Sequence, residues 1–92
     1  MKIIWSARSI SRLESIRAYI AKEAPITADR VVRRIILSTE LLKLFPNSRR
    51  FVPEYSIKEI REIIEAPYRV LYHVGTERIE ILNVLHSRQL LE

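Results

Sequence analysis

The chain has no cysteine and only two histidines among its 92 residues. Without Cys it can form neither a disulfide framework nor a thiolate zinc site. His73 and His86 are isolated from one another in the sequence and cannot bind a metal ion alone. The sequence therefore predicts a protein without a metal centre and without a cofactor.

Long apolar runs are also missing. No stretch approaches the roughly 20 apolar residues that cross a bilayer, and residues 1–5 are too short for the apolar region of a signal peptide. We expect a cytoplasmic protein with no membrane partner. The length suits one domain over residues 1–92, because two halves would each be too small to fold alone. Hydrophobic residues at 48% and charged residues at 29% are typical of a globular domain.

Positive charge is in excess. Sixteen Lys and Arg against eleven Asp and Glu give a net charge of +5, and most of these cations are Arg. The planar guanidinium group of Arg offers a fork of donors that suits carboxylate and phosphate groups. The balance favours an anionic partner, either nucleic acid or an acidic protein segment. A basic surface that only keeps the protein soluble is the alternative.

The first half of the chain predicts a strand followed by a helical hairpin. Residues 1–5 indicate a short strand, and Ser6 and Ser9 are possible helix caps. A first helix is expected from Ser9 to about residue 23, ended by Pro25. A second helix is expected to begin at Ile26 or Thr27 and to run as far as residue 45.

Apolar residues recur at three or four residue spacing in both predicted helices, which indicates one buried face on each. In the first helix this face comprises Ile10, Leu13, either Ile16 or Ala18, and Ile20. In the second helix it comprises Ala28, Val31, Val32, Ile35, Ile36, Leu42 and Phe45. The cations of the second helix fall largely off this face: Arg30, Arg33, Arg34 and Lys43. They form either a binding surface or the solvated side of an amphipathic helix.

The second half predicts a polar connector and three strands. Residues 46–55 have neither helical nor strand periodicity, and the strand candidates are residues 57–65, 68–74 and 78–86. Residues 75–77 form the turn between the last two strands, as in an antiparallel meander. In the last strand, alternation predicts two apolar faces, which places it inside the sheet. One face would carry Ile79, Ile81, Asn83 and Leu85, and the other Glu80, Leu82, Val84 and His86.

The order of elements predicts an α+β fold. An N-terminal strand and a three-stranded antiparallel meander form one small sheet of four strands, and the α-helical hairpin covers one face. The other face is left for function. Tyr68 and Tyr72 share a sheet face, where they either stack on bases or, as alternation with Val70 suggests, lie beneath the helices. Arg61 and Arg69 are expected to face the open side together. They would bind a partner there or pair with Glu62, Glu65 or Glu80 on neighbouring strands.

Four segments resemble the ParE-like toxins of the RelE/ParE type II toxin-antitoxin superfamily, which includes plasmid stabilisation proteins. Residues 46–54 resemble the family pattern P-x-x-G-R-x-V-P-E, and residues 60–63 its R-E-L. Residues 67–72 resemble P-Y-R-I-x-Y, and residues 81–88 resemble V-x-H-x-R-R. Order and spacing agree across roughly the second half of the chain. Two positions depart from the pattern, since Arg49 replaces the Gly and Gln89 replaces the second Arg after the His.

The resemblance implies a RelE/ParE-like fold and a toxin that a cognate antitoxin neutralises, through an acidic or partly disordered segment that folds across the toxin surface. Such a segment could lie along the helical hairpin and add a strand to a sheet edge. It also implies a toxin-antitoxin hetero-oligomer. ParE-like members poison DNA gyrase, whereas RelE cleaves mRNA on the ribosome. A third possibility is a repurposed member that only binds an antitoxin or nucleic acid.

An endonuclease would need a base for the 2′-hydroxyl, an acid for the leaving oxygen and cations around the phosphate. The candidates for these roles are Glu54, Arg61, Arg69, His86 and Arg88. RNA-cleaving relatives usually carry a denser cluster of cations and often a Tyr near the C-terminus. The residues after His86 include no Tyr, which favours the gyrase-binding branch with no catalytic residue and a structural role for His86. The candidates for partner binding are then Arg49, Arg50, Arg61, Arg69 and Arg88.

Overall fold

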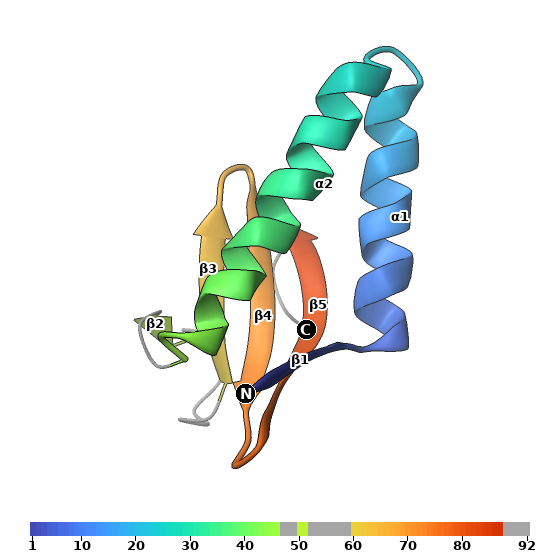
Figure 1. The fold of residues 1–92 in the computed structure, drawn as a ribbon. Helices are drawn as coiled ribbons and strands as arrows, with labels where there is room; N and C mark the ends of the chain where they lie inside the picture. Colours follow the sequence, from blue (N-terminus) through green and yellow to red (C-terminus); the bar gives the residue numbers. More distant parts are fainter. Residues whose placement is uncertain (47–49, 52–59, 88–92) are drawn as a thin grey trace.

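The computed structural model describes residues 1–46, 50–51 and 60–87. The chain forms an α+β fold in which two helices pack on one side of a small sheet (Figure 1). In chain order the elements are β1 (Lys2–Trp5), α1 (Ala7–Ala21), α2 (Pro25–Glu40), the 3-10 turn η1 (Leu41–Lys43), β2 (Arg50–Phe51), β3 (Ile60–Glu65), β4 (Tyr68–Val74) and β5 (Arg78–His86). The predicted fold class is confirmed, and so are the bounds of β4 and β5.

Helix α1 begins two residues before the predicted start because Ser6 caps it. The Ser6 hydroxyl accepts a hydrogen bond from the backbone N–H of Ser9 at 3.1 Å, and it lies 3.1 Å from the Leu82 carbonyl oxygen, to which it can donate. Ser9 is a buried residue in the first turn of α1, and its hydroxyl donates a hydrogen bond to the Ser6 carbonyl oxygen at 2.8 Å. Ser6 therefore satisfies a free N–H group at the helix start and ties α1 to β5.

Helix α2 differs from the prediction at both ends. It begins at Pro25, and neither Ile26 nor Thr27 is its cap. The first N–H groups of a helix have no partner within the helix, and Pro has no N–H group, so Pro is well suited to the first helical position. Pro25 therefore begins α2 and does not lie between the two helices. The helix ends at Glu40, and η1 replaces its expected last turn. Just before this end, the hydroxyl groups of the buried residues Ser38 and Thr39 donate to backbone carbonyl groups three residues earlier. Such side-chain bonds compete with the backbone hydrogen bonds of a regular helix.

Within the described residues the sheet has five strands in the order β1-β5-β4-β3-β2, one more than predicted. Strand β1 pairs with β5 in parallel, and the other three pairs are antiparallel. The additional strand, β2, has two residues and lies in the connector that has no strand periodicity. The position of β5 inside the sheet is confirmed, because it lies between β1 and β4.

A β-bulge in β5 corrects the predicted faces of this strand. Leu71 pairs with Asn83 and Tyr72 with Ile81, so Leu82 has no partner on β4. The extra residue shifts the alternation by one position. Val84 therefore joins Ile79 and Ile81 in the main core, whereas Leu82 and Leu85 belong to the small cluster on the opposite face.

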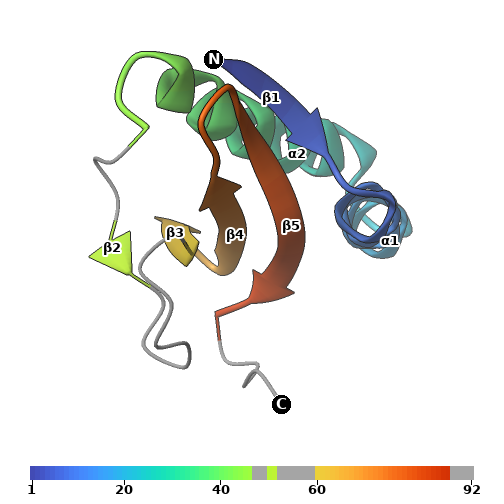
Figure 2. The same ribbon diagram turned by 90° about the horizontal axis from the view of Figure 1, so that it is seen from below.

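The main core fills the space between the helical hairpin and the sheet (Figure 2). Its buried residues are Val31, Ile35, Leu42, Ile63, Val70, Tyr72, Ile79, Ile81 and Val84. Tyr72 is fully buried, and its hydroxyl donates to the Pro46 carbonyl at 3.3 Å. Tyr68 is half-buried and packs against the same core. Burial beneath the helices is thus confirmed for this face of β4.

The opposite sheet face has a second, smaller cluster. It comprises Ile60, Leu71 and Leu85, with Leu82 packed against them. In Figure 2 both helices lie on the other side of β3, β4 and β5. This helix-free face is where the sequence places candidate functional residues.

Candidate functional site

The helix-free face contains a buried ion pair between Arg69 on β4 and Glu62 on β3. Nε and Nη2 of Arg69 donate to Oε2 of Glu62 at 2.9 and 2.7 Å. The exposed fractions of the two side chains are 7% and 0%. Glu62 lies opposite Leu71 and two positions from Ile60 on the same face of β3, so the pair adjoins the small apolar cluster. A buried guanidinium group needs such a partner, because an unpaired charge in this setting is costly.

The sequence predicts two alternatives for Arg69, partner binding or pairing with a Glu on a neighbouring strand. The structure shows the pairing. A partner protein or a phosphate group could reach the guanidinium only by displacing atoms that bury it. The geometry therefore suits a framework role, and binding through Arg69 stays a prediction.

Arg61 and Arg69 do not face the open side together, so that prediction is wrong. Arg61 lies opposite Tyr72, whose side chain is in the core beneath the helices. Arg69 lies opposite Ile64, three positions further along β3. Residues an odd number of positions apart on a strand point to opposite faces. The register of β3 and β4 thus separates the two Arg side chains.

His86 belongs to the helix-covered side as well. Its ring lies edge-on to Tyr68, with ring centroids 5.9 Å apart and planes at 79°. It also lines a cavity that includes Ile16 of α1 and Val84 of the main core. His86 and Arg69 are therefore on opposite faces of the sheet. The structure describes three of the predicted endonuclease residues, namely Arg61, Arg69 and His86. No two of them lie side by side on one face of the sheet, so they do not bring an acid, a base and a phosphate-binding cation together.

Three candidates, Arg49, Glu54 and Arg88, lie outside the described residues. Arg50 lies in β2, where its backbone pairs with Glu62 of β3. This pairing places β2 at the edge of the sheet, beside the strand that carries the buried carboxylate.

Sequence reasoning missed an apolar surface on the helical hairpin. Ile10, Ile36 and Phe45 were expected in the core, but they are 45%, 40% and 61% exposed. Other large apolar side chains of this part of the chain are exposed too: Ile26, Leu37, Leu41 and Leu44. The sequence does indicate this exposure, because Ile35, Ile36 and Leu37 are consecutive. Three consecutive residues on a helix cannot all face the core, so at least one of these apolar side chains must be exposed.

Two hollows on this surface meet at Ile36. One, of about 360 Å³, is lined by Trp5, Ile10, Leu13, Glu14 and Ile36. The other, of about 340 Å³, is lined by Asp29, Val32, Arg33, Ile36 and Leu37. We call these residues together the hairpin surface. It joins β1 and both helices, and contiguous exposed apolar area of this kind marks interaction sites.

The cations of α2 and η1 divide into two groups. Nε of Arg34 lies 3.3 Å from a carboxylate oxygen of Glu65, and Nζ of Lys43 lies 2.7 Å from one of Glu40. These two are surface pairs. Arg30 and Arg33 are exposed and make no ion pair within the described part of the chain. Arg33 lines the hairpin surface together with the acidic residues Glu14 and Asp29, so this apolar area has charges of both signs at its edge.

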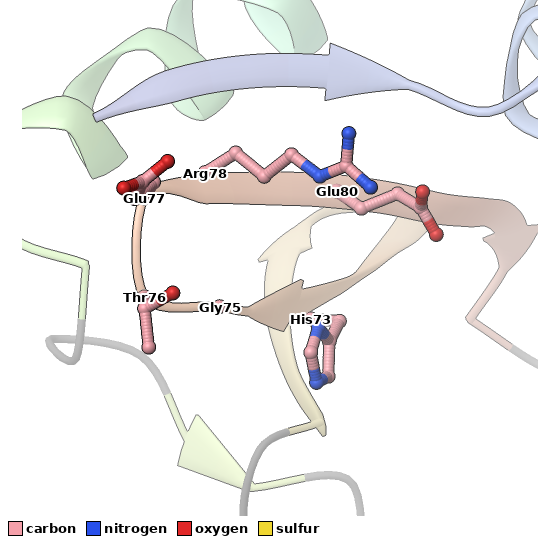
Figure 3. A pocket seen from close by; sticks show the side chains of 6 residues that line it. All are labelled: His73, Gly75, Thr76, Glu77, Arg78 and Glu80. Carbon is pink, nitrogen blue, oxygen red and sulfur yellow. The ribbon is translucent and has the colours of Figure 1, made fainter.

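A polar hollow of about 380 Å³ lies at the β4–β5 turn (Figure 3). It is lined by His73, Gly75, Thr76, Glu77, Arg78 and Glu80. His73 and Glu80 are cross-strand partners. Glu77, the other carboxylate of this hollow, points away from the His73 ring. Among residues 1–46, 50–51 and 60–87, no three His, Cys, Asp or Glu side chains are grouped to hold a metal ion. The same residues include no helix that is long and apolar enough to cross a membrane.

Comparison with known proteins gives consistent matches over nearly the whole chain. A family model described as ParE toxin of type II toxin-antitoxin system, parDE, matches residues 3–91. Y4kP of Sinorhizobium fredii, which is named as a toxin, is 39% identical over 90 residues, covering 96% of this chain and 90% of that protein. Toxin RelE2 of Caulobacter vibrioides is 25% identical over 89 residues, covering 97% and 98% of the two proteins.

The fold is similar to a chain in the structure of the chromosomal ParDE toxin-antitoxin system from P. aeruginosa. The TM-score is 0.78 at 20% sequence identity, and the match covers 94% of this chain and 95% of that chain. At this identity the likeness establishes the fold.

Proposed function

Because the chain belongs to the ParE toxin family of type II toxin-antitoxin systems, we propose that it acts by binding DNA gyrase and trapping the cleaved gyrase–DNA complex. In this proposal the toxin contributes protein contacts and performs no chemistry of its own. It acts in the cytoplasm, where gyrase is found. Loss of the antitoxin would free the toxin, so a plasmid that carried both would be stabilised.

The observation that carries the proposal is the separation of Arg69 and His86. The guanidinium of Arg69 is held by Glu62 on the helix-free face, whereas His86 contacts Tyr68 on the helix-covered side. Phosphodiester cleavage needs a proton-transfer group and cations within reach of one phosphate. This arrangement favours protein binding over catalysis by these residues.

The antitoxin is proposed to bind the hairpin surface. An amphipathic segment would bury apolar residues such as Ile36 and Leu37, and acidic residues would meet Arg33. Strand β1 is an edge strand next to this surface, so the segment could also add a strand there. The net charge of +5 favours an acidic partner. A hetero-oligomer of toxin and antitoxin follows from this arrangement.

The second candidate function is ribosome-dependent cleavage of mRNA. It is favoured by the similarity to toxin RelE2 over nearly the full length of both proteins. Its catalytic residues would have to include Glu54 or Arg88, which lie outside the described residues.

Induced expression in bacteria distinguishes the two functions. Gyrase poisoning predicts double-strand DNA breaks with covalently attached gyrase, and no toxin-specific 5′ ends in mRNA mapped by primer extension. Cleavage on the ribosome predicts new 5′ ends within coding regions and intact DNA. The variant His86→Ala serves as a second arm, because it should keep full toxicity if the toxin acts by protein contact. A folded His86→Ala protein that is non-toxic, together with new mRNA ends in the wild type, would reject the proposal.

A further inference from the structure

One row of residues runs along the side of α2 that faces away from the core. The buried residues of this helix are Ala28, Val31, Ile35, Ser38 and Thr39. On the opposite side, exposed residues recur at alternating spacings of four and three, which keeps them on one side of the helix. They are Ile26, Arg30, Arg33, Leu37 and Glu40, and Leu44 continues the row after η1. We call these six residues the outer stripe.

Half of the outer stripe is aliphatic although it faces solvent. The exposed fractions of Ile26, Leu37 and Leu44 are 69%, 58% and 73%. Leu41, which is 52% exposed, lies between Leu37 and Leu44 and extends the apolar area at this end. The solvent side of an amphipathic helix is ordinarily polar. Neighbouring aliphatic residues exposed in this way indicate a surface that another molecule covers.

The charged residues of the outer stripe have opposite signs in its two halves. Arg30 and Arg33 lie in the first half and make no ion pair within residues 1–46, 50–51 and 60–87. Glu40 lies in the second half. Its carboxylate pairs with Lys43 at 2.7 Å and has the capacity to accept further hydrogen bonds. Two such helices have complementary charges only when they lie antiparallel.

The order of residues along the outer stripe is self-complementary. With a two-fold axis at the level of residue 35, positions equally far before and after this level lie opposite one another in two antiparallel helices. Glu40 of one copy then lies opposite Arg30 of the other, and Leu44 lies opposite Ile26. Leu37 lies opposite Arg33, whose aliphatic stem can pack on it. Each contact is made twice, as in the isologous interface of a C2 dimer.

Other occupants fit the outer stripe less well. An acidic segment along its whole length would meet the like charge of Glu40. A nucleic acid would bind through its phosphates and leave the three aliphatic side chains without an apolar partner. The net charge of +5 on each copy opposes a dimer, but charges more than about 8 Å apart are largely screened at physiological ionic strength.

We propose that this protein forms a homodimer through antiparallel packing of the outer stripes of two α2 helices. Contact between two single helices buries less than the roughly 1,600 Å² of a standard interface, so we expect a dissociation constant in the micromolar range. Arg33 and Leu37 also belong to the hairpin surface, so the dimer and an antitoxin bound there would exclude each other. Only this consequence rests on the proposed antitoxin site.

Sedimentation equilibrium of the full-length protein without antitoxin, at physiological ionic strength, tests the proposal. The wild type should pass from monomer to dimer as its concentration rises through the micromolar range. Arg30→Glu and Glu40→Arg should each weaken association at least tenfold, because like charges then face each other twice. An equimolar mixture of these two variants should recover the association of the wild type, since each copy then meets opposite charge on the other.

Lys22→Glu is the matched control. It makes the same change in net charge as Arg30→Glu, but Lys22 lies at the C-terminal end of α1, outside the outer stripe. Its dimer should be as stable as that of the wild type. Circular dichroism of each variant checks that the fold is retained, and recovery in the mixture could occur only between folded proteins.

Three results would overturn the inference. A wild type that stays monomeric up to its solubility limit would leave the outer stripe to the antitoxin or the target. A dimer that Arg30→Glu and Leu37→Glu weaken no more than Lys22→Glu does would have its interface elsewhere. Absence of recovery in the mixture would reject the pairing of Arg30 with Glu40. Since the measurement uses the toxin alone, failure of the proposed function would leave its outcome unaffected.

Discussion

Removal of one charge from the buried ion pair should destabilise the protein strongly. In Glu62→Gln, the guanidinium of Arg69 stays in a site where only 7% of its side chain is exposed, but it loses the opposite charge 2.7 Å away. Breaking a buried pair in this way costs about 3 kcal/mol of unfolding free energy or more. For a domain of this size, a loss of 3 kcal/mol lowers the unfolding midpoint by more than about 10 °C.

A surface ion pair provides the matched control. Arg17 and Asp29 are also 2.8 Å apart, but their side chains are 55% and 63% exposed. Solvent screening leaves such a pair with about 0.5 kcal/mol, so Asp29→Asn should change stability little. The double variant Glu62→Leu with Arg69→Met removes both buried charges at once. It should unfold within about 1 kcal/mol of the wild type, since apolar residues of similar volume replace the pair.

Urea unfolding followed by far-UV circular dichroism measures all four proteins. The expected order of stability places wild type, Asp29→Asn and the double variant close together, with Glu62→Gln far below. If Glu62→Gln and Asp29→Asn lost the same small amount, the ion pair would not be a framework element. Arg69 could then serve in catalysis or partner binding.

Three further predictions concern the helix start, a turn and the hairpin surface. Ser6→Ala should lower the unfolding free energy by about 1 kcal/mol in urea titrations, because it removes a helix cap and a contact with β5, whereas Ser11→Ala on the exposed side of α1 should have little effect. Gly75→Ala should cost about 1 kcal/mol in the same measurement, because the added Cβ would lie 3.0 Å from the Arg78 carbonyl oxygen; no loss would show that the β4–β5 turn adjusts freely. Ile36→Glu should weaken antitoxin binding at least tenfold by calorimetry with stability retained, and unchanged affinity would remove the hairpin surface from the interface.

The sequence was sufficient for the fold wherever one side of an element is buried and the other is solvated. Alternation in β4 correctly placed Tyr72 in the core, because the helices cover that face. It failed in β5, where both faces are apolar and an extra residue at Leu82 leaves no mark in the pattern. A strand of two residues, such as β2, is too short to show any period.

The candidate site was harder to predict because it depends on strand register. Whether Arg61 and Arg69 share a face is decided by the pairing of β3 with β4, which periodicity within each strand does not fix. Pairing with a Glu was correctly foreseen as one alternative, but the choice of Glu62 required the register. Ile36 and Leu37 are exposed because successive residues on a helix point in different directions, and Ile35 takes the position that faces the core.

Poisoning of gyrase through protein contact is tested most directly with the purified enzyme. Purified gyrase, supercoiled plasmid, ATP and the toxin should be incubated together, and the DNA examined after denaturation of the protein. Linear DNA covalently linked to gyrase is expected at near-stoichiometric toxin. The cognate antitoxin should prevent its formation, and the His86→Ala variant should give the same result as the wild type. Intact supercoiled DNA at excess toxin, with protein shown to be folded, would rule out poisoning of this gyrase and favour cleavage of ribosome-bound mRNA.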